Sequence, residues 1–313
     1  MTDILFLGSN WEALSTLKIL VEDKRFNVVA IITQPDKPVG RKQTIVTSDI
    51  KKFALNKDIP VTHTEGKRSN YMKVRKTYKP DLIVCKSFGE MIPEFFLEYP
   101  EYGAINVHYS LLPKYRGAVP IQKAILKGEK VTGITYVKMV KALDAGGILK
   151  QIEEKIEPND TNSTLRERLV KITAETIGDV IEDWVYGRIR VTPQDESKAT
   201  YCKQSDISKE NAFIDWTMVN AETVDRMVRA FVPWPIAWTF FNEKRFKIFE
   251  CSLHKAKLKY PPGEYLFDGK SLYVVCQDDN KIVELIDVQL EGKNRMSGKQ
   301  FAQGQDIRRI SLL

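Results

Sequence analysis

The chain has 313 residues, 43% of them hydrophobic and 28% charged, a composition that is typical of a folded globular protein and excludes a disordered one. No apolar run approaches the ~18 residues of a membrane-spanning helix, and the start MTDILFLGSNW reads as a strand, not a secretion signal. The four cysteines form no C-x-x-C pair and there are only three histidines. We therefore expect a cytoplasmic protein with free thiols and no metal site.

Short apolar runs alternate with helical patterns through the first half of the chain. The runs predict strands at 4–8, 27–33, 81–87, 103–108 and 132–139, with a helix at 11–21. Continuous Val, Ile and Leu runs between helices indicate an α/β fold, a mostly parallel sheet with helices on both faces. In such Rossmann-like sheets a ligand binds at the carboxyl ends of the strands.

Basic residues are concentrated between the second and third predicted strands. From Lys37 to Lys79 there are twelve Lys or Arg against three acidic residues, and the loop at 33–49 is long and contains two prolines. This pattern is compatible with a solvated basic face and with a surface that binds phosphates. The net charge of +7 permits an anionic partner but does not identify one.

The second half has a different organisation. Helical patterns at 164–184 and 220–231 flank a polar, aperiodic stretch, and short strands with hairpin signals at NEK and DGK follow. Regularly spaced short strands suggest a small antiparallel barrel of the OB type. We therefore predict a catalytic domain at 1–188, a linker at 189–208 and a C-terminal OB-like domain at 209–313.

Three polar residues fall where strand ends are expected. Asn106 and His108 share one face of a strand because side chains alternate along it, and Asp144 lies in a turn before two glycines. An amide steadies the oxygen that gains charge in acyl transfer, an imidazole moves a proton near neutral pH, and a carboxylate orients the imidazole. A structural role for His108 stays open on this chemistry alone.

Two other kinds of site are disfavoured by their missing motifs. The first strand–helix turn, GSNWEA, is not G-x-G-x-x-G, so a dinucleotide site has little support. Ser110 lies near His108, but the G-x-S-x-G elbow of a serine hydrolase is missing from the sequence. Direct transfer to an incoming nucleophile therefore fits better than a covalent enzyme intermediate.

The stretch NVHYSLLPKYRG with the later LDAGGI resembles the signature of the 10-formyltetrahydrofolate-dependent formyltransferases. Members of that family formylate methionyl-tRNA, glycinamide ribonucleotide or nucleotide-linked amino sugars, or hydrolyse the formylfolate. The loop TQPDKPVGR and four C-terminal stretches are similar to the members that act on methionyl-tRNA: 214–216, 229–238, 261–264 and 290–301. The resemblance runs in order from Ile4 to about Gln305.

This resemblance implies transfer of a formyl group from 10-formyltetrahydrofolate to the α-amine of methionyl initiator tRNA. It implies catalysis by Asn106, His108 and Asp144, with either His108 or Asp144 as the immediate base. Residues implied to bind the folate are Ser110, Leu111, Leu112, Pro113, Phe88, Met91 and Ile92. Residues implied to bind tRNA are Lys37, Arg41 and Lys42, together with basic stretches of the C-terminal domain at 242–249 and 254–259.

Two alternatives remain at the level of sequence. A formyltransferase acting on a sugar nucleotide or another small amine would use the same donor and need no RNA. A non-catalytic RNA-binding protein would keep the fold and the basic surface without turnover. We expect a monomer that needs no metal for its chemistry and has no membrane partner.

Overall fold

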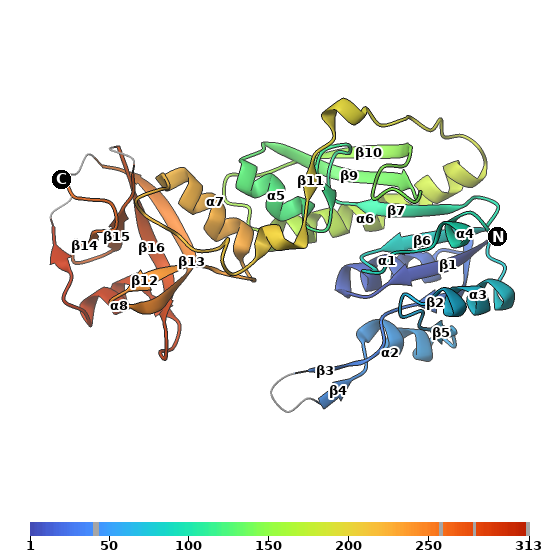
Figure 1. The fold of residues 1–313 in the computed structure, drawn as a ribbon, viewed down its shortest axis with the longest axis horizontal. Helices are drawn as coiled ribbons and strands as arrows, with labels where there is room; N and C mark the ends of the chain where they lie inside the picture. Colours follow the sequence, from blue (N-terminus) through green and yellow to red (C-terminus); the bar gives the residue numbers. More distant parts are fainter. Residues whose placement is uncertain (40–43, 257–258, 278–279, 311–313) are drawn as a thin grey trace. The chain divides into compact units, whose positions relative to one another are not determined.

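The computed structural model describes residues 1–39, 44–256, 259–277 and 280–310, and of the segment 37–46 only the backbone of two short strands (Figure 1). These residues form two compact units. Unit 1 comprises 1–116, 132–154 and 167–201, and unit 2 comprises 117–131, 155–166 and the chain from 202 onward. None of the helices in the described part is long and apolar enough to cross a bilayer. The predicted domain limits of 1–188, 189–208 and 209–313 stay a prediction.

Unit 1 is built on a seven-stranded sheet in the order β10-β9-β7-β6-β1-β2-β5. Its strands are β1 (Thr2–Gly8), β2 (Phe26–Ile32), β5 (Val61–Thr62), β6 (Leu82–Lys86), β7 (Ala104–His108), β9 (Val131–Lys138) and β10 (Ile148–Lys155). The neighbours from β7 to β5 are parallel, whereas β9 runs antiparallel to β7. The predicted mostly parallel α/β sheet is therefore confirmed.

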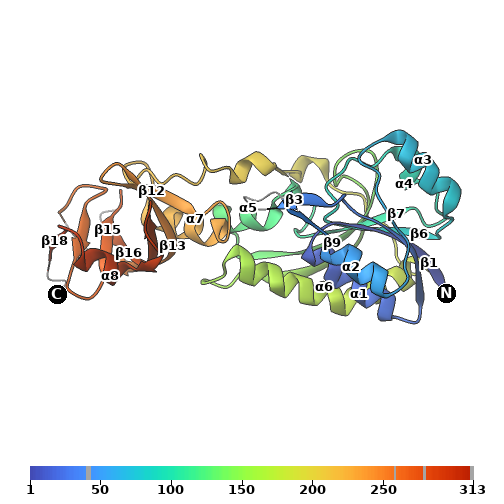
Figure 2. The ribbon, with the colours of Figure 1, turned by 90° about the horizontal axis from the view of Figure 1, so that it is seen from below.

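Helices cover both faces of this sheet, as the view in Figure 2 shows. On one side lie α1 (Trp11–Glu22), α2 (Asp49–Asn56) and the larger part of α6 (Asn162–Val185), and on the other α3 (Arg68–Thr77) and the short α4 (Glu94–Leu97). Because both faces are covered, the central strand is apolar throughout its middle, and Ile4 to Leu7 are completely buried. Helix α1 is capped by Asn10, whose side chain accepts the Ala13 N–H at 3.0 Å. Two further short strands, β3 (Lys37–Val39) and β4 (Thr44–Val46), form a separate antiparallel pair.

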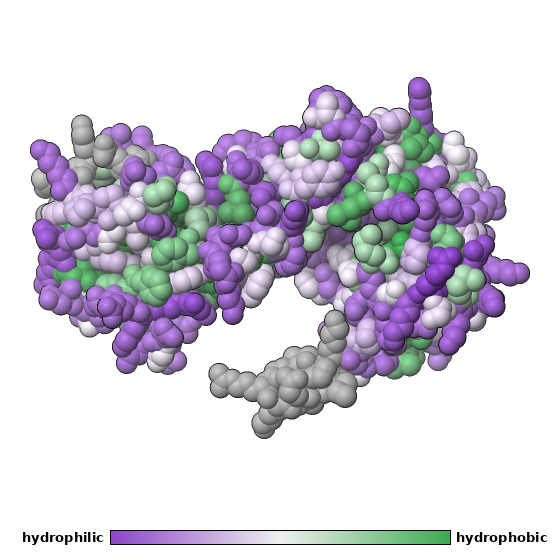
Figure 3. Space-filling model, viewed as in Figure 1, coloured by the Kyte–Doolittle hydropathy of each residue, from purple (hydrophilic) through white to green (hydrophobic). Residues whose placement is uncertain are grey.

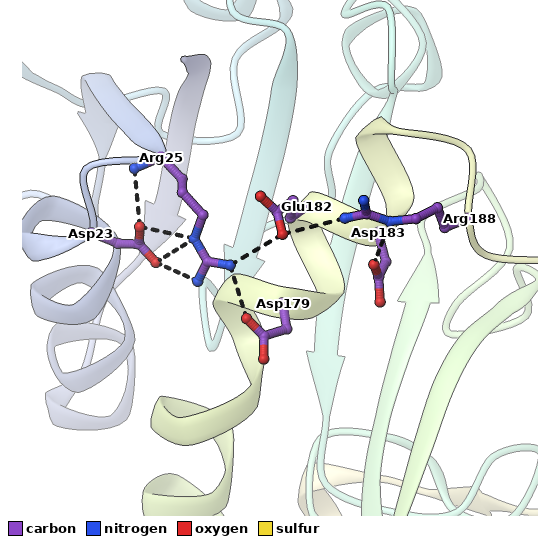
Figure 4. A network of polar contacts seen from close by, with 6 residues as sticks. All are labelled: Asp23, Arg25, Asp179, Glu182, Asp183 and Arg188. Carbon is purple, nitrogen blue, oxygen red and sulfur yellow. Dashed lines mark hydrogen bonds and ion pairs between the residues drawn. The ribbon is translucent and has the colours of Figure 1, made fainter.

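A network of charged residues ties helix α6 to the turn between α1 and β2 (Figure 4). Arg25 contacts Asp23 at 2.6 Å, Asp179 at 2.8 Å and Glu182 at 3.4 Å. Glu182 also contacts Arg188, which lies just beyond the end of the helix. These side chains are partly exposed, so the network fixes the position of α6 more than it adds stability.

Unit 2 contains a second sheet, in the order β12-β13-β16-β15-β14-β18, with β17 beside β16. Its strands are β12 (Ala237–Phe241), β13 (Lys244–Lys255), β14 (Tyr265–Phe267), β15 (Leu272–Val275), β16 (Lys281–Leu290), β17 (Met296–Ser297) and β18 (Arg308–Arg309). Its helices are α5 (Pro120–Lys127), α7 (Ala221–Phe231) and α8 (Gly298–Gln303). The described residues also form two 3₁₀ turns: η1 (Glu196–Lys198) belongs to unit 1, and η2 (Gln204–Ile207) belongs to unit 2. A small pair of strands, β8 (Arg116–Gly117) and β11 (Tyr201–Cys202), completes the assignment. The expected C-terminal domain of antiparallel strands is confirmed, because all neighbours from β12 to β14 run antiparallel.

The hairpin signals read from the sequence lie where strands turn. Asn242 and Glu243 connect β12 to β13 with φ values of 46° and 63°, as a two-residue hairpin requires. The rings of Phe241 on β12, Phe246 on β13 and Phe301 on α8 pack against one another with centroids 4.5–5.9 Å apart. Hydrophilic residues cover most of the visible surface of each unit, and apolar residues form small separate patches (Figure 3).

Candidate active site

Two of the three polar residues singled out from the sequence, Asn106 and His108, lie on strand β7. Asn106 pairs with Cys85 of β6 and with Val137 of β9, and His108 pairs with Thr135. Burial raises the pKa of the Cys85 thiol to about 12, so this neighbour of Asn106 is protonated at neutral pH and is no nucleophile.

Asn106, His108 and Asp144 converge although Asp144 is 36 residues further along the chain than His108. Asn106 Nδ2 donates to Asp144 Oδ1 at 3.2 Å, and His108 Nδ1 lies 3.6 Å from Asp144 Oδ2. The His108 side chain is 5% exposed and that of Asp144 11%. The structure therefore brings the three predicted catalytic residues into one cluster.

The two nitrogens of His108 have different partners. Nε2 lies 2.9 Å from the carbonyl oxygen of Tyr115, which can only accept, so Nε2 carries a proton. In the neutral ring Nδ1 then has its lone pair directed toward the side of Asp144. Since 3.6 Å is longer than a hydrogen bond, Nδ1 is the nitrogen that remains available to accept a proton.

The charge state of His108 follows from its burial. Burial lowers the pKa of the imidazole, and the Asp144 carboxylate and the Tyr115 carbonyl oppose that change without cancelling it. The ring is therefore neutral at pH 7 and able to act as a base. Protonation of Nδ1 would create an imidazolium held between a carboxylate and a carbonyl oxygen.

The loop that follows β7 is fixed by hydrogen bonds within unit 1. Ser110 Oγ donates to Lys114 O at 2.6 Å, and Thr135 Oγ1 donates to Ser110 O and accepts the Leu112 N–H. Gln151 Nε2 donates to the Leu112 carbonyl at 2.8 Å. Ser110 and Leu112 are therefore buried parts of the frame, whereas Leu111 and Pro113 are partly exposed.

A pocket beside the cluster is bordered by Asn106 and Asp144 themselves. Two of the predicted folate-binding residues, Met91 and Ile92, line it, but Phe88 is 3% exposed and packs into the hydrophobic core instead. The remaining lining residues were not singled out from the sequence: Glu90, Leu97, Val137, Lys138, Met139, Val140, Lys141 and Leu143. Most belong to the end of β9 and the segment that follows it, and the sequence alone did not show that this part of the chain lies beside β7.

Glu90 is the member of this pocket with the most hydrogen bonds. Its carboxylate accepts from Gln34 Nε2 at 2.8 Å, Thr64 Oγ1 at 2.6 Å, the Gly66 N–H at 2.8 Å and Tyr71 OH at 3.1 Å. It joins the loop after β6 to elements up to 56 residues away in sequence. A glutamate in a loop gives no sequence signal for such a role.

The residues predicted to bind tRNA lie in or near the β3–β4 segment. Lys37 begins β3, while Arg41 and Lys42 fall outside the described residues. Asp36 lies just before this segment and contacts Lys51 Nζ at 2.7 Å and the Ser48 N–H at 3.3 Å, which closes the base of the loop. In unit 2, His254 in the predicted basic stretch contacts Glu284 at 2.6 Å.

Within the part of the chain that the structure describes, no group of three or more His, Cys, Asp or Glu residues could hold a metal ion. The free cysteines include Cys85, Cys202 and Cys276, all buried.

Comparisons with known proteins follow the same two-part organisation. Residues 4–181 match the model of the formyl transferase family, and residues 206–306 match that of the formyl transferase C-terminal domain. Curated relatives from Staphylococcus aureus strains MW2 and JH1, both named methionyl-tRNA formyltransferase, are 37% identical over 305 residues, which is 97% of this chain and 96% of theirs.

Solved structures share the fold at lower identity. WlaRD, a sugar 3N-formyl transferase, has a TM-score of 0.67 at 20% identity and covers 94% of this chain and 99% of its own. An N-formyltransferase from Helicobacter canadensis has a TM-score of 0.68 at 19% identity, covering 91% and 99%. HypX from Aquifex aeolicus has a TM-score of 0.63 at 18% identity, covering 99% of this chain and 49% of its own. With both of its domain models matched and relatives 37% identical along its length, this chain belongs to the formyltransferase family.

Proposed function

We propose that this enzyme transfers the formyl group of 10-formyltetrahydrofolate to the α-amino group of methionyl initiator tRNA. The observation that carries the proposal is the cluster of Asn106, His108 and Asp144 at the border of an apolar pocket. The S. aureus relatives, which are similar over 97% of this chain and named methionyl-tRNA formyltransferase, support the choice of acceptor.

The pocket fits a flat heterocycle such as the pterin ring of the donor. Its walls include Ile92, Leu97, Met139 and Leu143, and one side carries Asn106 and Asp144. Apolar walls with a few convergent polar groups are the usual form of such sites. When bound there, the donor supplies an activated formyl group. Ser110 to Pro113 and Phe88 would support the site as its frame.

The three clustered residues divide the work of the transfer. The Asn106 amide donates a hydrogen bond to the oxygen that gains charge. His108 Nδ1, neutral because the ring is buried, accepts the proton of the attacking amine and returns it to the departing nitrogen. Asp144 holds Asn106 through a 3.2 Å hydrogen bond and stabilises the imidazolium while it exists.

The acceptor is expected to contact basic residues outside this cluster. Lys37, Arg41 and Lys42 would bind tRNA phosphates, and the stretches 242–249 and 254–259 would extend that contact. We propose that the enzyme acts as a monomer in the cytoplasm, where charged tRNA is used. Light scattering of the purified protein at micromolar concentration tests the monomer.

A single-turnover assay tests the function. The protein is mixed with 10-formyltetrahydrofolate and methionyl initiator tRNA, with His108→Asn and uncharged tRNA as controls. Formyl-methionine should form only with the parent enzyme and charged tRNA, and His108→Asn should reduce the rate by about 10²–10⁴-fold. Formylation of a sugar nucleotide or another small amine without RNA would support the second candidate. Binding of tRNA that survives His108→Asn, with no turnover in the parent, would indicate a non-catalytic RNA-binding protein.

A further inference from the structure

The segment after helix α6, expected from its sequence to be part of a linker, lies against the loop that carries Asp144. Ile148 and Thr192 exchange two backbone hydrogen bonds of 2.8 and 2.9 Å. Two residues further on, Gln194 Nε2 donates to the carbonyl oxygens of Asp144 and Gly146, both at 2.7 Å. Both amide hydrogens of Gln194 are therefore used on the catalytic loop.

The conformation of this loop needs such support. Asp144 has a φ of 48°, in the left-handed region that non-glycine residues rarely adopt. Gly146 is packed so tightly that an added Cβ would lie 1.7 Å from the Lys138 carbonyl oxygen. A residue in this region keeps its conformation only when the surrounding structure holds it. The two bonds from Gln194 hold the backbone on both sides of Ala145.

Gln194 is itself held in one orientation. Its Oε1 accepts from Nε and Nη2 of Arg116 at 3.0 and 2.8 Å, and Arg116, 1% exposed, also contacts Glu196 at 2.7 and 2.9 Å. Because a guanidinium only donates, the Gln194 oxygen must face Arg116 and its NH₂ group must face the catalytic loop.

The same segment also contacts the support of His108. Thr200 Oγ1 accepts the Tyr115 N–H at 2.8 Å, and the Thr200 carbonyl accepts the Arg116 N–H at 2.8 Å. Tyr115 is the residue whose carbonyl oxygen fixes the tautomer of His108. Segment 192–200 thus contacts the backbone that carries Asp144 and the backbone that orients His108.

We propose that Gln194 is a positioning residue of the formyl-transfer site, which keeps the Asp144 carboxylate in place beside Asn106 and His108. This inference rests on the proposed function. Gln194 acts through the Asp144 backbone and has no role on the reacting atoms themselves.

The decisive variant is Gln194→Glu, which has nearly the same shape. It keeps an oxygen facing Arg116 but replaces the NH₂ group, so a carboxylate oxygen meets two carbonyl oxygens. We expect kcat for formyl transfer to fall by about 10²-fold, as displacement of a catalytic group by about 1 Å does, with KM and the thermal midpoint little changed. Gln194→Leu, which adds no charge, should show the same loss. Gln303→Glu, the same change at an exposed position in α8, serves as the matched control.

A second measurement needs no turnover. The imidazole ¹⁵N signals of His108 should move in Gln194→Glu and Gln194→Leu, and stay in place in Gln303→Glu. Unchanged kcat and unchanged signals in both Gln194 variants would overturn the inference, and so would a loss of kcat that only follows the loss of folded protein. A parent enzyme that forms no formyl-methionine would overturn the proposed function, while the NMR comparison would still decide whether Gln194 holds the site.

Discussion

His108 is the residue whose protonation determines whether the site can accept a proton. Burial lowers its pKa from the ordinary value of about 6.5, and Asp144 acts in the opposite direction. The attacking methionyl amine must also be unprotonated, so the quantity to follow is kcat/KM divided by the fraction of neutral amine. This corrected kcat/KM should be maintained below pH 6.5 and lost as the pH falls through the lowered pKa of His108. As the pH falls, the unfolded chain protonates this ring before the folded protein does. The contribution of His108 to the free energy of unfolding is therefore complete above about pH 6.5 and is lost as the pH falls from there through the lowered pKa.

The variant Asp144→Asn tests how much the Asp144 carboxylate raises the pKa of His108. Removing the negative charge removes the largest influence that raises the pKa of His108, so the pKa should fall further. An NMR titration of ¹⁵N-labelled histidine measures this directly, because the chain has only three histidines. His63→Asn serves to assign the signals. A higher His108 pKa in Asp144→Asn than in the parent would contradict the prediction, because it would mean that the Asp144 carboxylate does not raise this pKa.

Glu12 and Lys86 form an ion pair of 3.5 Å whose side chains are 2% and 3% exposed. The Lys86 ammonium also donates to Val107 O at 3.1 Å and lies 3.1 Å from the centre of the Tyr109 ring. Removing one partner weakens the electrostatic compensation of the buried charge that remains, so Glu12→Gln and Lys86→Met should each lower the free energy of unfolding by about 3–5 kcal/mol. The double variant should lose clearly less than the sum of the two, as measured by urea unfolding. Additive losses would mean that the two charges do not stabilise one another.

At the scale of elements, the Glu90 carboxylate makes several of the hydrogen bonds that hold the loop after β6. Ser87 and Gly89 have φ values of 50° and 81°, and Glu90 links the loop to four donors from other parts of the chain. Glu90→Leu should loosen this wall of the pocket and raise the Kd for tetrahydrofolate by about tenfold, which corresponds to 1.4 kcal/mol. Glu90→Gln, which keeps one oxygen acceptor, should have an intermediate effect in a calorimetric titration. Glu98→Gln, at an exposed position just after α4, provides the control, and equal affinities in all three variants would contradict this role.

The elements that the sequence predicted are those with strong local signals. The buried runs, the helix of 162–185 and the N-x-H pair needed no knowledge of distant residues, and each lies within two or three residues of its predicted place. The short strands β5, β3 and β4 have weak patterns and were not predicted. Glu90 and Gln194 were also missed, since their roles consist of contacts with residues 19–78 positions away and nothing in their own neighbourhood reveals them.

At the scale of the whole molecule, the excess of 48 basic over 41 acidic residues should make acceptor binding depend on salt. Each phosphate that a lysine or arginine neutralises releases counterions, with a slope of about −0.7 to −0.9 per contact on logarithmic scales. If Lys37, Arg41 and Lys42 make three such contacts, raising salt from about 50 to about 200 mM should increase KM for methionyl-tRNA about 20- to 40-fold.

The folate donor separates this effect from a general loss of activity, since its pocket wall is largely apolar and its KM should change little over the same range of salt. Lys37→Gln should reduce the slope of log KM for methionyl-tRNA against log salt by about 0.7–0.9, the change expected when one phosphate contact is lost. Lys57→Gln, exposed in the same basic stretch but at the end of α2, should leave the slope unchanged if the contact is local. Equal slopes for the parent and both variants would place the tRNA phosphates on other basic residues. A slope that falls equally in both variants would instead mean that the stretch from 37 to 79 acts through its summed charge.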